Sequence, residues 1–101
     1  MKYSLNVYGE NDEIEKTYET DKARYGAFEE AIRFVDEAQG KSEAEKNILA
    51  FRMLGRFVKK LFVGLTDDEV SKCEMNDIIS LAYEVSGIAS PLATNEGDSK
   101  N

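Results

Sequence analysis

The chain has 101 residues, 42% hydrophobic and 33% charged, which gives room for one domain and places it in the globular range. Its 13 Lys and Arg stand against 20 Asp and Glu, a net charge of -7, which argues against a general nucleic-acid binder because phosphate affinity depends on cations. With no His and a single Cys, the composition excludes Ser-His-Asp and Cys-His catalysis, His-containing zinc sites and an intrachain disulfide.

The N-terminal segment predicts a β-hairpin. Residues 3–8 alternate in polarity, and three side chains share one face of the predicted strand: Tyr3, Leu5 and Val7. A polar loop at 9–12 leads to a second strand over 13–18, on which three further side chains share a face: Ile14, Lys16 and Tyr18. Because an isolated hairpin is marginal in water, we expect the helices that follow to cover its apolar face.

Two long helices are predicted next. The first spans about 25–38 and ends at Gly40, with apolar residues at steps of three and four: Tyr25, Phe28, Ala31, Ile32, Val35 and Ala38. The second is the longest element and runs from Ser42 to about Val63. Ser42 and Glu45 have the spacing of a capping box, in which each side chain satisfies a free backbone amide of the other residue.

Two shorter helices complete the predicted domain. A break at Gly64 is followed by a second capping box at 66–69, which starts a helix that ends near Cys73. The last helix begins at Met75 or Asn76 and reaches Ile88. The predicted fold class is therefore α+β, mostly α, with an N-terminal hairpin followed by three to four helices.

The C-terminal residues lack a periodic apolar pattern. We therefore predict a single domain over 1–88 and a disordered tail over 89–101, where too little apolar surface is available to offset the entropy of ordering. No apolar run approaches the roughly 18 residues of a membrane span, and the N-terminus lacks the apolar stretch of a signal peptide. The expectation is a cytoplasmic protein that does not engage a membrane.

The longest predicted helix carries a basic stripe. On a helical wheel four cations fall on one continuous arc: Arg52, Arg56, Lys59 and Lys60. One interpretation is ordinary surface electrostatics, with acidic neighbours such as Asp36, Glu37 and Glu45. The other is pairing with an acidic patch on another copy. Residues 1–46 contain 7 cations and 12 anions, whereas 47–74 contain 5 and 4, an asymmetry that suits head-to-tail self-association.

The same helix has an unusually wide apolar arc of about 200°, nearly twice what a surface helix needs. One interpretation is that the helix is central and is buried on several sides. The other is that part of the arc, beside the basic stripe, binds a partner. The predicted partner-binding residues are Leu49, Arg52, Met53, Arg56, Phe57 and Lys60.

The sequence offers no catalytic, cofactor or metal site. Paired carboxylates at 29–30, 36–37 and 67–68 are interpreted as charges at helix N-termini or on solvated faces, because adjacent helical residues point about 100° apart. Cys73 is interpreted as a small buried hydrophobic residue rather than a reactive thiol. We expect a protein that is not an enzyme.

Two stretches resemble a known family. FVKKLFVGLTDDEV at 57–70, followed by IISLAY at 78–83, is similar to the tail assembly chaperones of long non-contractile-tailed bacteriophages. Many of those begin with a hairpin of the kind that residues 5–13 suggest, so the resemblance covers about 3–88. It implies a protein that coats the tape measure protein, helps recruit tail tube subunits and acts in the cytoplasm of the infected host without remaining in the mature virion.

Such chaperones are commonly made in two lengths, the longer by a ribosomal frameshift near the end of the short frame. Residues 99–101, Ser-Lys-Asn, can be encoded by codons that contain a slippery heptanucleotide, and the tail would then link to the extension. An ordinary polar terminus is the alternative. Two other functions stay open: an acidic inhibitor or nucleic-acid mimic that relies on Glu10, Asp12, Glu13 and Glu15, and a minor structural tail component.

Overall fold

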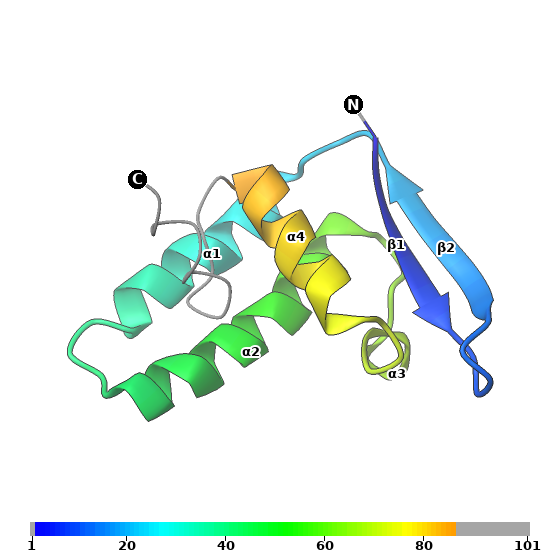
Figure 1. Ribbon diagram of the computed structural model, residues 1–101. Helices are drawn as coiled ribbons and strands as arrows, with labels where there is room; N and C mark the ends of the chain where they lie inside the picture. Colours follow the sequence, from blue (N-terminus) through cyan, green and yellow to red (C-terminus); the bar gives the residue numbers. More distant parts are fainter. Residues whose placement is uncertain (1, 87–101) are drawn as a thin grey trace, which may run out of the picture.

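The computed structural model describes residues 2–86, which form two strands and four helices (Figure 1). In chain order these are β1 (Tyr3–Tyr8), β2 (Ile14–Thr20), α1 (Tyr25–Glu37), α2 (Glu43–Leu61), α3 (Asp67–Val70) and α4 (Met75–Ser86). The strands pair antiparallel, so the predicted α+β class is confirmed. The tail predicted at 89–101 lies outside the described residues, and the domain boundary at 88 stays a prediction.

The hairpin buries one face of β1, as its alternation predicts. Leu5 is 1% and Val7 2% exposed, and their partners across the ladder are Tyr18 and Lys16. The register then shifts, so that the next pair is Tyr8 and Ile14. This β-bulge moves Ile14 to the outer face of the hairpin, because directly paired residues point to the same side of a ladder. The prediction that Ile14 shares a face with Lys16 and Tyr18 is therefore wrong.

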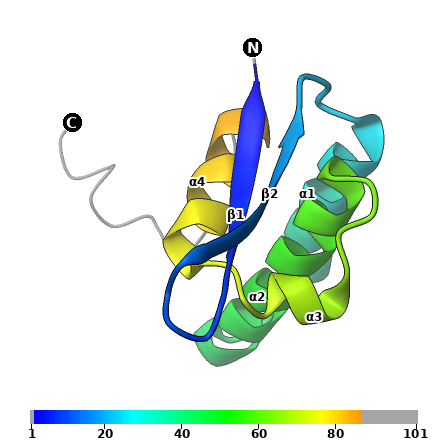
Figure 2. The same ribbon diagram turned by 90° about the vertical axis from the view of Figure 1, so that its right-hand side faces the viewer.

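The helices form a layer beside the hairpin. Helices α1 and α2 lie side by side in opposite directions, α4 crosses them, and the hairpin stands at the end where α2 finishes (Figures 1 and 2). A single apolar cluster is built from β1, α1, α2, α4 and the residues after α2, with Tyr18 of β2 and Val70 of α3 packed against it. Its largest fully buried apolar members are Phe57, Phe62, Leu5, Leu54, Leu61, Val7 and Val58. Since α2 supplies four of these seven side chains, it is the central helix of the domain.

Both predicted capping boxes are present. The hydroxyl of Ser42 accepts a hydrogen bond from the Glu45 amide at 3.2 Å, and the Glu45 carboxylate accepts one from the Ser42 amide at 3.1 Å. Thr66 and Glu69 repeat this arrangement at the start of α3. Gly40, at the predicted stop after α1, has a φ of +75°, in the left-handed region that favours glycine.

Helix α2 ends at Leu61 instead of the predicted Val63. Phe62 leaves the helix with φ −110° and ψ 107°, is 1% exposed, and places its ring 6.3 Å from that of Tyr18. Val63 is 72% exposed, and Gly64 follows with φ +94°. The helix therefore stops two residues early because the aromatic ring turns inward to pack beneath the hairpin.

Candidate interaction surface

The predicted basic stripe on α2 is present, but three of its four cations are engaged within the fold. Arg56 Nε lies 2.7 Å from a carboxylate oxygen of Glu30, and Lys60 Nζ lies 3.6 Å from the other oxygen. Lys59 forms an ion pair with Asp67 at the start of α3. Arg52 is exposed and has no ion pair or hydrogen bond through its side chain within residues 2–86. Of the stripe, Arg52 is therefore the side chain most available to a partner.

Glu30 is the centre of an ion cluster between α1 and α2. It is 1% exposed, and besides the two α2 cations it receives Arg33 of its own helix at 3.4 Å. Burial raises the pKa of Glu30, but the hydrogen bond from Arg56 and the charges of Arg33, Arg56 and Lys60 outweigh it and leave the pKa below its usual value. The carboxylate thus remains ionised at neutral pH and holds the two helices together.

The interpretation of the pair 29–30 as solvated charges is wrong for Glu30. A signal for its burial was present in the sequence, because Glu30 lies three residues after Ala27 and four before Phe34, both of which are in the core. Asp36, Glu37 and Glu45, the predicted neighbours of the basic stripe, form no ion pair with it. The first-turn position of Asp67 and Asp68 in α3 is as predicted.

The apolar half of the predicted partner strip lies largely in the core. Met53 is 4% and Phe57 0% exposed, and Leu49 is partly buried against the same cluster. These side chains face the core because α1, α4 and the hairpin pack around α2, so the wide apolar arc belongs to a central helix. In this fold Met53 and Phe57 are not at the surface, and the strip as predicted is not available to a partner.

Other large apolar side chains are exposed on the helices. They are Tyr25, Ile32 and Val35 on α1, Ile48 and Phe51 on α2, and Met75 and Tyr83 on α4, with exposures between 41% and 68%. The three α1 residues belong to the predicted apolar face of that helix, and the spacing of a face does not indicate how wide its buried part is. These side chains, rather than Met53 and Phe57, are the apolar surface that a partner can reach.

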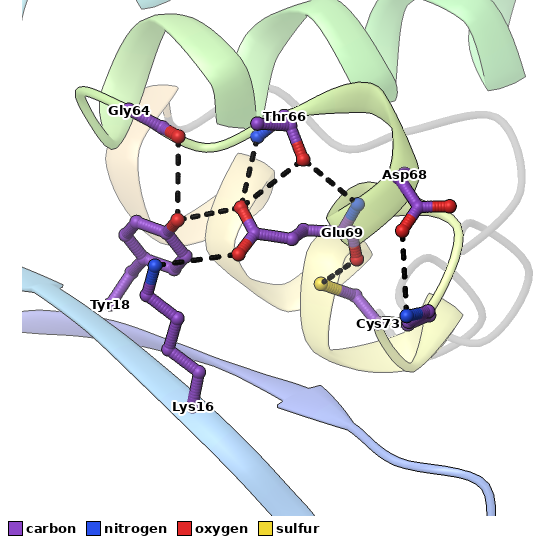
Figure 3. Close-up of polar contacts among 8 residues, drawn as sticks. Lys16, Tyr18, Gly64, Thr66, Asp68, Glu69 and Cys73 are labelled. Carbon is purple, nitrogen blue, oxygen red and sulfur yellow. Dashed lines mark hydrogen bonds and ion pairs between the residues drawn. The ribbon is translucent and has the colours of Figure 1, made fainter.

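A second polar cluster joins the hairpin to α3 (Figure 3). The Tyr18 hydroxyl donates to Glu69 at 2.6 Å, and Lys16 Nζ lies 3.4 Å from the other carboxylate oxygen and 4.5 Å from the Tyr18 ring centroid. The Tyr18 hydrogen bond, the Thr66 amide and Lys16 together lower the pKa of Glu69 to about 2. Because the carboxylate is ionised and fully bonded to its neighbours, we assign it a structural role.

Cys73 is partly buried, and its thiol lies 3.3 Å from the Glu69 carbonyl oxygen. Burial, followed by the charges of Asp77 and Glu69, raises the pKa of this thiol, which favours the unreactive protonated form. The backbone of Cys73 also pairs with β1, since it forms an isolated antiparallel bridge with Val7. Cys73 thus acts as a packing and pairing residue, although it is less buried than predicted.

An open cleft of about 510 Å³ lies between the β1–β2 loop and residues 71–74. Within residues 2–86, no three His, Cys, Asp or Glu side chains are grouped to hold a metal ion. None of the helices in that range combines the length and apolar character of a bilayer-spanning segment.

Comparison with known proteins gives no assignment. No protein-family model matches the chain, and neither a curated protein nor a solved structure matches it.

Proposed function

We propose that this protein is a bacteriophage tail assembly chaperone. It binds the tape measure protein, helps recruit tail tube subunits and self-associates through its helical surface. The observation that carries the proposal is the set of large apolar side chains left exposed on α1, α2 and α4. Exposed apolar side chains bordered by charge are the surface that a chaperone needs to cover aggregation-prone helices of a client.

The resemblance adds support. Residues 57–70 and 78–83, which resemble the family, comprise the end of α2, the turn at Gly64, α3 and the middle of α4. The hairpin that opens the resemblance is packed against the same region through Tyr18 and Phe62. The similar segments thus form one connected part of the fold.

Self-association is expected to use the exposed edge of the basic stripe. Arg52 has no partner within residues 2–86 and lies one helical turn from Ile48, which is 50% exposed. Arg56 and Lys60 contribute to the same positive face, although both also hold Glu30. An acidic surface on another copy, or on a client, complements this face.

The test is co-expression with the longest coiled-coil protein encoded just downstream in the same genome. We expect that protein to become soluble and to co-purify with this one, and to remain insoluble when expressed alone. Arg52→Glu tests the part of the basic stripe in this interaction. Lys41→Glu is its control, because both substitutions change the net charge equally and Lys41 is exposed in the α1–α2 loop. Failure of the wild-type chain to increase solubility of the client would contradict the proposal.

Recruitment of tail tube subunits is assigned to a longer, frameshifted form. Its slip site at residues 99–101 lies outside the described residues, and the nucleotide sequence tests it directly. A slippery heptanucleotide followed by an open −1 frame is expected. We also expect the protein in the cytoplasm of the infected host and not in purified virions, which mass spectrometry of particles can check.

An acidic inhibitor is the second candidate. Four carboxylates at the tip of the hairpin form no ion pairs within residues 2–86: Glu10, Asp12, Glu13 and Glu15. A surface of this kind can occupy a basic site on an enzyme, and such binding falls steeply with salt. Glu10→Gln and Glu15→Gln would abolish that activity, whereas a chaperone would retain client binding.

A further inference from the structure

Helix α1 carries an exposed apolar stripe on the side away from α2. Four side chains lie within an arc of about 80° on the helical wheel: Tyr25, Phe28, Ile32 and Val35. Three of them are exposed, Tyr25 by 68%, Ile32 by 53% and Val35 by 44%, whereas Phe28 is partly buried against the core. The stripe is roughly opposite Glu30, the residue that faces α2.

Two unpaired carboxylates border this stripe. Glu29 lies four residues after Tyr25, and Asp36 four residues after Ile32, so both are next to the stripe on the surface of the helix. Both are exposed, and neither forms an ion pair within residues 2–86. Their seven-residue spacing corresponds to about 10 Å along the axis. The outer face of α1 is therefore apolar with an acidic border.

We propose that the outer face of α1 docks an amphipathic helix that carries Lys or Arg beside its own apolar stripe. The 13 residues of α1 span about 20 Å, and their apolar side chains have the spacing that packs against another helix. Glu29 and Asp36 give the charge complement of a basic border. The inference deepens the proposed function and rests on it, because it names the chemistry of the helical client.

A second copy fits this face less well. Two α1 helices related by a two-fold axis and packed in opposite directions place equivalent borders on the same side of the contact. Glu29 and Asp36 of the two copies would then lie close together and repel. The acidic border thus favours a basic partner over antiparallel self-pairing of α1.

The test uses the full chain and two synthetic helical peptides of about 18 residues, long enough to span α1. Both have Leu at helical spacing, one with Lys and the other with Glu along the border. Fluorescence anisotropy is expected to give a Kd about tenfold lower for the Lys peptide. Ile32→Asp should weaken that binding about tenfold or more. Ile14→Asp, matched in residue type and at 56% exposure on the outer face of the hairpin, should leave it unchanged.

The carboxylates are tested separately. The double substitution Glu29→Lys and Asp36→Lys should reverse the preference, so that the Glu peptide binds more tightly. Equal binding of both peptides, or equal loss in the Ile32 and Ile14 variants, would overturn the proposal. The proposal would also be overturned if the wild-type chain bound neither peptide and formed an oligomer that Ile32→Asp dissociates. That result would assign the face to a second copy.

The remaining alternative to a basic helix on this face is the chain's own C-terminal segment. If Ile88→Asp with Leu92→Asp creates peptide binding that the wild-type chain lacks, the face belongs to that segment and the proposal is wrong. The two proposals fail independently. Peptide preference without client solubilisation would contradict the chaperone function alone, whereas client solubilisation without peptide preference would contradict the α1 site alone.

Discussion

Glu69 combines a local and a long-range role in one carboxylate. It closes the capping box of α3 with Thr66 and accepts a hydrogen bond from Tyr18, 51 residues away in the sequence. Its pKa of about 2 lies below the ordinary value of 4.5. A carboxyl whose pKa is lower in the folded state contributes stability that is fully present above pH 4.5 and lost as the pH falls towards 2.

We therefore expect Glu69→Gln to destabilise the protein at pH 7 and to have a much smaller effect near pH 2, as measured by urea unfolding. Glu45→Gln is the matched control. Glu45 has the same position in the capping box of α2, and within residues 2–86 its side chain bonds to Ser42 alone. If the two variants lose equal stability at pH 7, the link between Glu69 and Tyr18 contributes nothing.

Glu30 supports a second prediction at the level of single residues. Glu30→Ala is expected to cost about 2 kcal/mol of unfolding free energy at neutral pH, because three cations lose a buried partner yet remain accessible to water. Arg33→Ala should cost less than about 1 kcal/mol, because that side chain is half exposed. Equal losses in chemical denaturation would contradict the central role of Glu30.

The elements were predictable to the extent that their signals are local. Capping boxes and glycines place the helix starts and stops, and alternation predicts the buried face of β1. Three features join residues far apart in the sequence. The register shift between Val7 and Tyr8 lies beside the bridge from Val7 to Cys73, Phe62 leaves its helix to pack beneath Tyr18, and the carboxylate of Glu30 binds cations of α2.

For the candidate surface, the helical wheel of α2 does not predict which side of the helix faces outward. The wheel separates the cations of α2 from its apolar arc correctly. It contains no information on how many neighbours pack on that arc, and for α2 the arc is covered around Met53 and Phe57. Arg52 was predictable as a surface cation, whereas the commitment of Arg56 and Lys60 to Glu30 needed the position of α1.

Helix α2 gives a direct test of this difference between core and surface. Met53→Asp and Phe57→Asp should unfold the protein, because each buries an unpaired carboxylate in the central cluster. Ile48→Asp on the same helix should stay folded, since that side chain is 50% exposed. Circular dichroism with thermal melts checks all three, and a folded Met53→Asp would return that residue to the partner surface.

At the scale of the whole molecule, some cations of α2 stabilise the fold, whereas Arg52 is available to bind a partner. Reversing Arg56 or Lys60 would place a carboxylate beside Glu30, so a loss of self-association there would not separate binding from folding. Arg52→Glu avoids this and is expected to reduce the oligomer size at low salt, with less effect at high salt. Sedimentation velocity measures the oligomer size, with Lys41→Glu as the control. An unchanged size would remove the basic stripe from self-association.

The contact between β2 and α3 also has a consequence for how the molecule opens. A helix of four residues is too short to persist alone, and α3 is held from outside by Tyr18 and Lys16 through Glu69. The hairpin in turn has few buried contacts on β2. The two segments should therefore lose amide protection together in hydrogen exchange, as one cooperative unit that opens before α1 and α2 separate.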